Sequence, residues 1–180
     1  IDNNGGSLVQ IGGTFMSENL EVNNLSQPQF DQFILYGGIN IIESKVKMKD
    51  TYILNSKGED GINLFNSNSV LKNIKIINSN SDGVDIDGGK LSFSQIECIK
   101  IKNDCLDISG SNFKGKLLKA TNIGDKALSL GEKSTGDIKE LFVKSANIGV
   151  AVKDLSSLNL EKLSSEDINI EAAVFIKKNE

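Results

Sequence analysis

Short stretches in which apolar and polar residues alternate recur along most of this chain at a constant spacing. In the stretch 61–66 (GINLFN), the alternation places Ile62 and Leu64 on one side of an extended strand and Asn63 on the other. Steps of 22 residues lead from this pair to five more pairs: Val84 and Ile86, Leu106 and Ile108, Leu128 and Leu130, Val150 and Val152, and Ala172 and Val174. All twelve positions are apolar although apolar residues make up only 38% of the chain, so the repeat is genuine.

Each unit of 22 residues contains one or two further alternating stretches, such as 71–76 and 91–99. Gly, Asn, Ser and Asp separate these stretches, and such residues favour turns. The apolar spacing of two and the many β-branched residues indicate strands rather than helices. We therefore expect an all-β, right-handed parallel β-helix, a solenoid of roughly seven to eight coils with about 22 residues per coil.

The repeat is regular in only part of the chain. One β-helix domain is expected over residues 1–180, with irregular early coils at 1–58 and regular coils at 59–180. Either the early coils carry insertions, or the register slips near Lys57 to Asp60. The chain ends on a strand-like run without a polar cap, so we expect a fragment of a longer helix, with further coils or an adjoining domain at its ends.

A leucine-rich repeat is the alternative fold, since its period of about 20–29 residues includes 22. The stretch 155–163 (LSSLNLEKL) fits its leucine spacing once, and 71–76 (LKNIKI) fits it in part. The mixture of Leu and Ile, and the lack of a helical segment in each unit, favour the β-helix.

Residues that recur just before the inward pairs predict a polar ladder. Asn103, Asp125, Asn147 and Asn169 stand at steps of 22. Stacked amides at a turn can hydrogen-bond from coil to coil, so we expect an asparagine ladder that contains one Asp.

The chain has two cysteines, Cys98 and Cys105, which are too few to indicate a redox compartment. Two buried thiols are the favoured interpretation, and a local disulfide between them is the alternative.

Composition excludes several classes of chemistry. The chain contains no His, Arg or Trp, and its 20 cationic side chains are all Lys, set against 24 Asp and Glu for a net charge of −4. It therefore lacks the residues for a Ser-His-Asp or Cys-His nucleophile, a His-ligated zinc or haem, or a bidentate Arg clamp on phosphate. The acidic balance, the lack of a run of Lys that would build a basic face, and the 6% aromatic content predict no nucleic-acid partner. No apolar stretch reaches the length of a membrane span, and no secretory signal opens the sequence.

Polar residues concentrate on and beside one strand of the coil between residues 80 and 154. Eleven of them form the candidate site: Asn80, Asp82, Asp85, Asp104, Asp107, Asp125, Lys126, Ser129, Glu132, Lys153 and Asp154. Asp85 and Asp107 lie one coil apart on the outward face, so their carboxylates should be roughly 5 Å from each other. Stacked like charges lower the stability of the fold, so their presence favours a role in binding a ligand. The alternative is that alternating Asp and Lys residues only solvate the surface.

Four of these residues are the catalytic candidates: Asp82, Asp104, Asp125 and Lys126. A Lys among carboxylates could act as a desolvated base. The other seven are the candidate substrate-binding residues. The carboxylates could also hold a divalent cation such as calcium, although the stretch 82–87 (DGVDID) lacks the closing Glu of a calcium loop, and otherwise no cofactor is expected.

Three motifs about one coil apart, NSDG at 80–83, KNDC at 102–105 and GDKALSLGE at 124–132, resemble those of a known family. They are similar to the strand-leading motifs of polygalacturonase-type glycoside hydrolases, within the pectate-lyase-like β-helix superfamily. Asn80 and Asp82 match the Asn-x-Asp motif of that family. Asp104 and Cys105 match its Asp-Asp-Cys motif, and the resemblance covers about 50 residues.

The chain also departs from the family at three places. Asn103 replaces the leading Asp of the second motif, and Asp125 and Lys126 stand where the family has His and the following Gly. The later Arg-x-Lys of the family has no counterpart beyond Lys153. Asn103 cannot donate the proton that a general acid supplies, so the inherited machinery is incomplete.

Two functions therefore stand side by side. The resemblance implies an extracellular or cell-surface β-helix domain that binds a polysaccharide or cell-surface glycan and could act on it as a glycosidase, lyase or epimerase. The alternative is a non-catalytic structural or adhesive rod that spaces other domains. Asn103 in place of a catalytic carboxyl and the scarcity of Tyr and Trp for sugar stacking favour this alternative.

Overall fold

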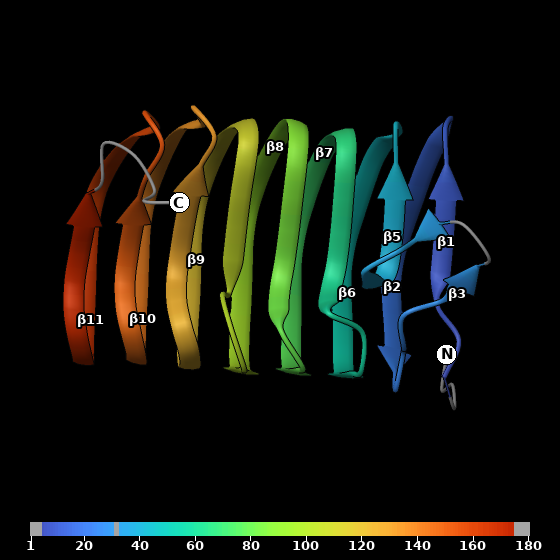
Figure 1. Cartoon of the computed structure of the whole chain (residues 1–180), viewed down its shortest axis with the longest axis horizontal. Helices are drawn as coiled ribbons and strands as arrows, with labels where there is room; N and C mark the ends of the chain where they lie inside the picture. The colour runs from blue at the N-terminus through green and yellow to red at the C-terminus, as the bar shows by residue number, and fades with distance from the viewer. Residues whose placement is uncertain (1–4, 31–32, 175–180) are drawn as a thin grey trace.

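A computed structural model describes residues 5–30 and 33–174, and this part of the chain is a parallel β-solenoid of about six turns (Figure 1). Successive coils lie side by side from the N-terminal to the C-terminal end of the molecule. The strands are β1 Leu8–Ile11, β2 Thr14–Asn23, β3 Gln29–Phe30, β4 Phe33–Ile34, β5 Gly37–Ile42, β6 Lys45–Ser56, β7 Asp60–Ser79, β8 Asp82–Ile101, β9 Leu106–Gly131, β10 Thr135–Val152 and β11 Ser157–Val174. Because 5–30 and 33–174 contain no helix, the all-β prediction is confirmed and the leucine-rich repeat is excluded.

Parallel pairing at a step of 22 residues carries the repeat. Ile62 in β7 pairs with Val84 in β8, which pairs with Leu106 in β9. Ten of the twelve predicted inward positions are buried in one continuous core. Ala172 and Val174 are exposed, because no later coil covers β11 within the described residues.

Both explanations for the irregular early coils hold. β1 pairs with β5 and β2 pairs with β6 at a step of 31, because the antiparallel hairpin of β3 and β4 is inserted between them. The register also slips: Ser56 pairs with Ser79 at a step of 23, whereas Asp60 pairs with Asp82 at a step of 22. The longer first step is one reason why the turns number about six instead of the seven to eight expected.

The expectation of two buried thiols is wrong. Cys98 in β8 and Cys105 just before β9 form a disulfide, with Cα atoms 5.7 Å apart, within the usual range for such a bridge. The turn between the two strands folds the chain back into the core, so two fully buried inward positions meet although they are seven residues apart.

The asparagine ladder is confirmed for its last three members. The Asn147 side chain donates to Asp125 at 3.3 Å, and Asn169 donates to Asn147 at 3.2 Å. Asn103 departs from this ladder because its amide donates to Asp82 Oδ1 at 2.7 Å.

A second asparagine ladder runs along another corner of the coil. Asn55 donates to Asn23 at 3.0 Å, and Asn78 donates to Asn55 at 2.8 Å. Asn55 and Asn78 adopt positive φ angles of 54° and 64°, a conformation that Asn tolerates better than most residues. The sharp corner of the coil thus depends on this left-handed position.

Candidate functional site

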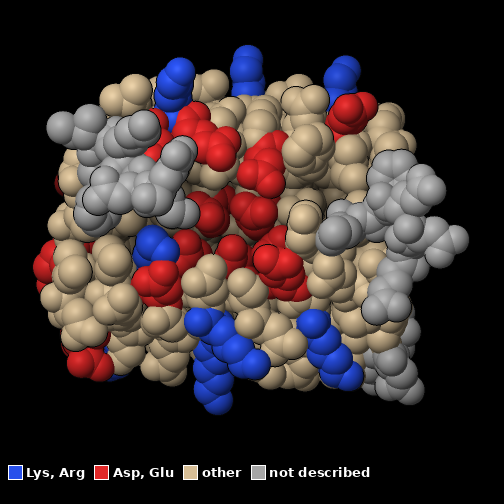
Figure 2. All heavy atoms as spheres, viewed as in Figure 1, with Lys and Arg blue, Asp and Glu red and all other residues tan. Residues whose placement is uncertain are grey.

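Acidic side chains gather on one face of the solenoid, near the middle of the view in Figure 2. We call seven of them the acidic patch: Asp60, Asp82, Asp85, Asp87, Asp104, Asp107 and Glu132. The sheet register sets their spacing, since Asp60 pairs with Asp82 and Asp85 pairs with Asp107 in neighbouring coils. The predicted row of stacked carboxyl groups is therefore present.

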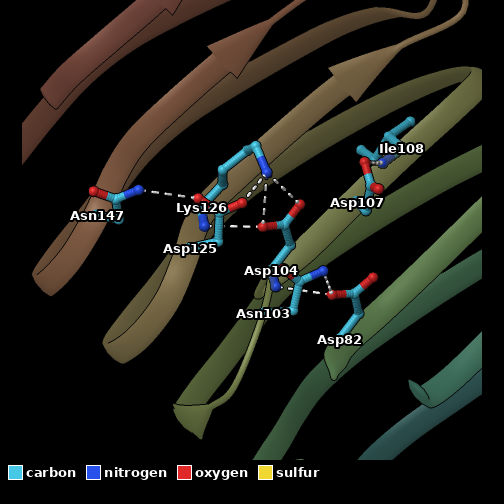
Figure 3. Close-up of polar contacts among 8 residues, drawn as sticks. All are labelled: Asp82, Asn103, Asp104, Asp107, Ile108, Asp125, Lys126 and Asn147. Carbon is cyan, nitrogen blue, oxygen red and sulfur yellow. Dashed lines mark hydrogen bonds and ion pairs between the residues drawn. The ribbon is translucent and has the colours of Figure 1, made fainter. Parts of the chain in front are cut away.

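The Asp82 carboxyl is built into the turn of the next coil (Figure 3). Its Oδ1 accepts hydrogen bonds from the Asn103 amide at 2.7 Å and from the Asp104 backbone N–H at 2.8 Å. Burial nevertheless outweighs these bonds and raises the pKa of Asp82 above its ordinary value.

Asp104 repeats the arrangement one coil further on. Its Oδ1 accepts the Lys126 backbone N–H at 2.9 Å, and the Lys126 ammonium lies 3.4 Å from both carboxyl oxygens (Figure 3). Burial raises the pKa of Asp104 to about 7 against the opposing charge of Lys126, and the charge of Asp82 adds to the increase. One oxygen of each of these two carboxyls thus supports the backbone.

Lys126 lies between two carboxyl groups. Its ammonium also donates to Asp125 Oδ2. Burial acts to lower the pKa of Lys126, but the hydrogen bond to Asp125 and the charges of Asp104 and Asp125 outweigh it and raise the pKa. For Asp125, burial is likewise outweighed by the bonds from Lys126 and Asn147, so that its pKa is lowered. This environment favours an ammonium donor over the base expected from the sequence.

The middle of the patch holds carboxyl groups whose pKa values are raised to about 7 or 8. Burial, and then the charges of Asp87 and Asp60, raise the pKa of Asp85 to about 8. Burial and the charge of Asp82 raise the pKa of Asp60 to about 7. The Asn63 amide bridges the two groups, at 3.3 Å from Asp60 Oδ2 and 3.2 Å from Asp85 Oδ2.

Three further acidic residues flank this centre. The Asp107 carboxyl accepts the Ile108 backbone N–H at 2.9 Å (Figure 3). Burial, and then the charge of Glu132, raise the pKa of Asp87. The exposed Glu132 therefore belongs electrostatically to the patch, as its place at the end of the strand predicts.

The remaining predicted site residues are placed less favourably for a ligand. Asn80 lies on an exposed turn, where its amide donates to the Lys57 carbonyl at 3.2 Å and its oxygen accepts from Lys102 at 2.9 Å. Ser129 is fully buried, and its hydroxyl has no hydrogen-bond partner among the residues that the structure describes. Lys153 and Asp154 are half-buried, and the charge of Lys153 contributes to the low pKa of Asp125.

Sequence reasoning missed Asp60, Asn63 and Asp87 as members of the site. A step of 22 residues back from Asp82 reaches Asp60 and supplied a signal that would have found it. It also missed Phe65, which pairs with Asp87 in the next coil and is 48% exposed.

No group of three or more His, Cys, Asp or Glu residues within 5–30 and 33–174 is placed to hold a metal ion. The Asp82 and Asp104 carboxyls instead accept backbone N–H groups. In the same part of the chain, no helix has the length and apolar character needed to cross a bilayer.

No family model, no curated protein and no solved structure matches the chain.

Proposed function

We propose that this chain is the carbohydrate-binding domain of an extracellular β-helix protein, with the acidic patch in contact with the glycan. The observation that carries the proposal is the cluster of buried and half-buried carboxyl groups at its centre, of which Asp85, with its pKa raised to about 8, is the most accessible. A protonated carboxyl both donates and accepts hydrogen bonds, as a sugar hydroxyl does.

Exposed aromatic rings at one end of the patch support a sugar ligand. Phe65 is 48% exposed beside Asp87, and Tyr36 is 43% exposed, with its backbone carbonyl accepting the Asp60 N–H at 3.1 Å. An aromatic face packs against the apolar face of a sugar ring while neighbouring polar groups bind its hydroxyls. The scarcity of Tyr and Trp therefore does not argue against sugar binding, since Phe65 supplies such a face.

The charge of the patch points to a neutral glycan or one that carries amino groups. The chain contains no Arg, and Lys126 beside the patch is already paired with Asp104 and Asp125. Uronic acid residues would meet uncompensated carboxylates, which repel them. The proposed ligand therefore differs from the polyuronide that the polygalacturonase resemblance implies.

Processing of the glycan belongs to the same proposal. Glycoside hydrolysis needs one protonated carboxyl and one carboxylate. Asp85 and Asp107 pair in neighbouring coils and are half-buried, whereas Asp82 and Asp104 are occupied by backbone N–H groups. If the domain is a glycosidase, Asp85 would be its acid and Asp107 its nucleophile, because carboxyl groups one coil apart, roughly 5 Å, suit the retaining mechanism.

The disulfide supports the extracellular location. Cys98 and Cys105 are fully buried and bridged. Disulfides form and persist mainly in oxidising compartments, such as the outside of the cell.

Glycan binding by an Asp85→Ala variant tests the proposal. Ala removes both the donor and the acceptor that the carboxyl offers to a sugar hydroxyl, so affinity for neutral or amino-sugar oligosaccharides should fall about tenfold in calorimetric titrations. Glu161→Ala, at an exposed carboxyl in β11 outside the patch, is the control and should bind as the original chain does. Unchanged affinity in a folded Asp85→Ala variant, or no binding across a panel of such oligosaccharides, would overturn the proposal.

A structural rod is the second candidate function, and the two backbone contacts favour it. Asp82 and Asp104 each accept the backbone N–H of the equivalent residue one coil later, so these carboxyls hold coils together. A rod predicts that Asp82→Ala lowers the free energy of unfolding, by about 1–3 kcal/mol, while no variant of the patch alters binding to any glycan.

A further inference from the structure

Lysine side chains gather on a different face of the solenoid from the acidic patch. Five of them line two adjoining grooves that share Val70: Lys47, Lys49, Lys72, Lys90 and Lys114. All five are exposed. They come from β6, β7, β8 and β9. In each coil they lie in the sheet segment that follows the Asp85 and Asp107 positions along the chain, and alternate residues of that segment face outward.

The longer groove crosses the strands from β7 to β11 and has a volume of about 870 Å³. Its lining includes the apolar side chain of Val70, which is 38% exposed, whereas Leu91 and Phe113 are each 3% exposed and belong to the core. Lys90 lies in one outward row of this sheet and Lys114 in the next, on either side of the inward row of Leu91 and Phe113. The groove therefore has one ammonium group on each rim.

This face is positively charged although the whole chain carries −4. The two grooves contain only two carboxylates within the described residues, Glu18 and Asp137. Glu18 is ion-paired with Lys49, and Asp137 accepts the Asn159 amide at 3.3 Å. Lys45 extends the outward row of Lys90, and Lys116 and Lys139 lie beside the longer groove together with Glu161. These lysines gather on one face although the sequence contains no run of Lys, because residues that recur once per coil stack on one another.

We propose that the grooves bind a linear anionic polysaccharide, one that carries carboxylate or sulfate groups, with its axis along the solenoid. Neighbouring coils are about 4.8 Å apart, close to the length of one sugar residue in an extended chain. Successive rim residues can therefore meet successive sugars. The ammonium groups pair with the acidic groups, Asn68 and Asn112 hydrogen-bond hydroxyls, and the exposed Val70 packs against a ring.

The groove fits a sugar polymer better than the other polyanions. Single-stranded nucleic acid binding relies on exposed aromatic rings for base stacking, but Phe113, the aromatic residue lining these grooves in the described part of the chain, is buried. A flat bilayer surface would not follow a concave channel. This site is separate from the proposed function, because the acidic patch would repel the same ligand.

Calorimetric titration with a heparin oligosaccharide as the anionic probe, and with uncharged dextran beside it, tests the proposal. The double variant Lys90→Gln with Lys114→Gln should bind the heparin probe about tenfold more weakly, and added salt should weaken binding to the unaltered protein. Lys144→Gln with Lys162→Gln is the matched control, since these exposed lysines lie in β10 and β11 on the neighbouring sheet face and pair with Glu166 and Glu140. The control should bind within about twofold of the unaltered protein, and dextran should not bind the lysine grooves.

Three results would overturn the proposal. The unaltered protein could fail to bind the heparin probe, or both double variants could lose heparin affinity equally. Duplex DNA or phosphatidylserine vesicles could also bind more tightly than heparin, with that binding lost in the Lys90→Gln and Lys114→Gln variant. Asp85→Ala should leave heparin affinity undiminished. If the acidic patch fails to bind a glycan, heparin binding by the lysine grooves is therefore unaffected. If the lysine grooves fail to bind heparin, the proposal for the acidic patch is likewise unaffected.

Discussion

Asp60 and Asp104 are almost fully buried, yet each is tied into the coil by a specific hydrogen bond. Asp60 accepts the Asn63 amide, and Asp104 accepts the Lys126 backbone N–H. A buried carboxyl that is ionised pays a desolvation penalty, and a protonated one avoids it. The same residues thus hold the fold together and make the acidic face responsive to pH.

The raised pKa values predict that stability decreases as the pH rises. An Asp carboxyl in the unfolded chain loses its proton near pH 3.9, whereas Asp60 and Asp104 in the folded chain hold theirs to about 7. Between these values the folded state binds more protons, so the free energy of unfolding falls with rising pH, by at most about 1.4 kcal/mol per pH unit for each group. Urea unfolding should give a lower midpoint at about pH 8 than at about pH 5.

The Asp60→Asn variant provides the control for this effect. Asn mimics the protonated carboxyl, so its share of the pH dependence disappears and the two midpoints should approach each other. A midpoint that rises with pH in the unaltered protein would contradict the argument.

Lys100 occupies a left-handed backbone position that suits Asn better. Its φ is 59°, and the equivalent residues one coil before and after, Asn78 and Asn122, have φ angles of 64° and 57°. Lys100→Asn should therefore raise the free energy of unfolding by roughly 0.5–1 kcal/mol. Lys114→Asn, at an exposed strand position without a positive φ, should leave it unchanged or lower it in the same denaturation assay.

At the scale of the strands, large and small residues alternate from coil to coil. Phe93 packs over Gly115 and Phe113 over Gly136, so each ring fills the space that a missing side chain leaves in the next coil. The two rings are themselves stacked, with centroids 6.2 Å apart. Neighbouring strands of a solenoid lie at a constant spacing. A large side chain in one coil therefore needs a small residue beside it in the next coil.

Gly136→Ala tests this matching. The added Cβ would lie 1.8 Å from the Phe113 ring, so β9 or β10 has to shift and the free energy of unfolding should fall by about 1–3 kcal/mol. At Gly131 the nearest atoms to such a Cβ are 3.4 Å away on the flexible side chains of Lys153 and Asp154. Gly131→Ala should therefore cost little, and equal losses in thermal unfolding would contradict the interpretation.

The molecule as a whole is a one-dimensional stack with two oppositely charged faces. Coils contact only their neighbours, and the acidic patch and the lysine grooves each collect residues from several coils. Net charge therefore describes this protein poorly, because charges of each sign are sorted onto different sheets of the same coil.

Stacking predicts a gradient of stability along the axis. β8 is covered by β7 and β9, whereas β11 is covered on one side only within the described residues and is largely exposed. Amide hydrogen exchange should be slowest in β7, β8 and β9 and fastest in β1 and β11. Uniform protection across all coils would contradict a nearest-neighbour stack.

The sequence by itself determined the period, the inward positions and the row of Asp85 and Asp107, because each depends only on spacing along the chain. It also placed the ladder from Asp125 to Asn169. Asn103 broke that expectation because a nearer acceptor, Asp82, was available in space.

The tertiary structure decided how buried and how paired each of these groups is. Spacing could not show that the turn before β9 brings Cys98 to Cys105, that Asp104 is desolvated, or that Lys126 is held between two carboxyls. Nor could it show the lysine grooves, whose members are scattered along the chain. Burial, pKa and surface charge depend on distances between coils, and those distances exist only once the chain has wound into its solenoid.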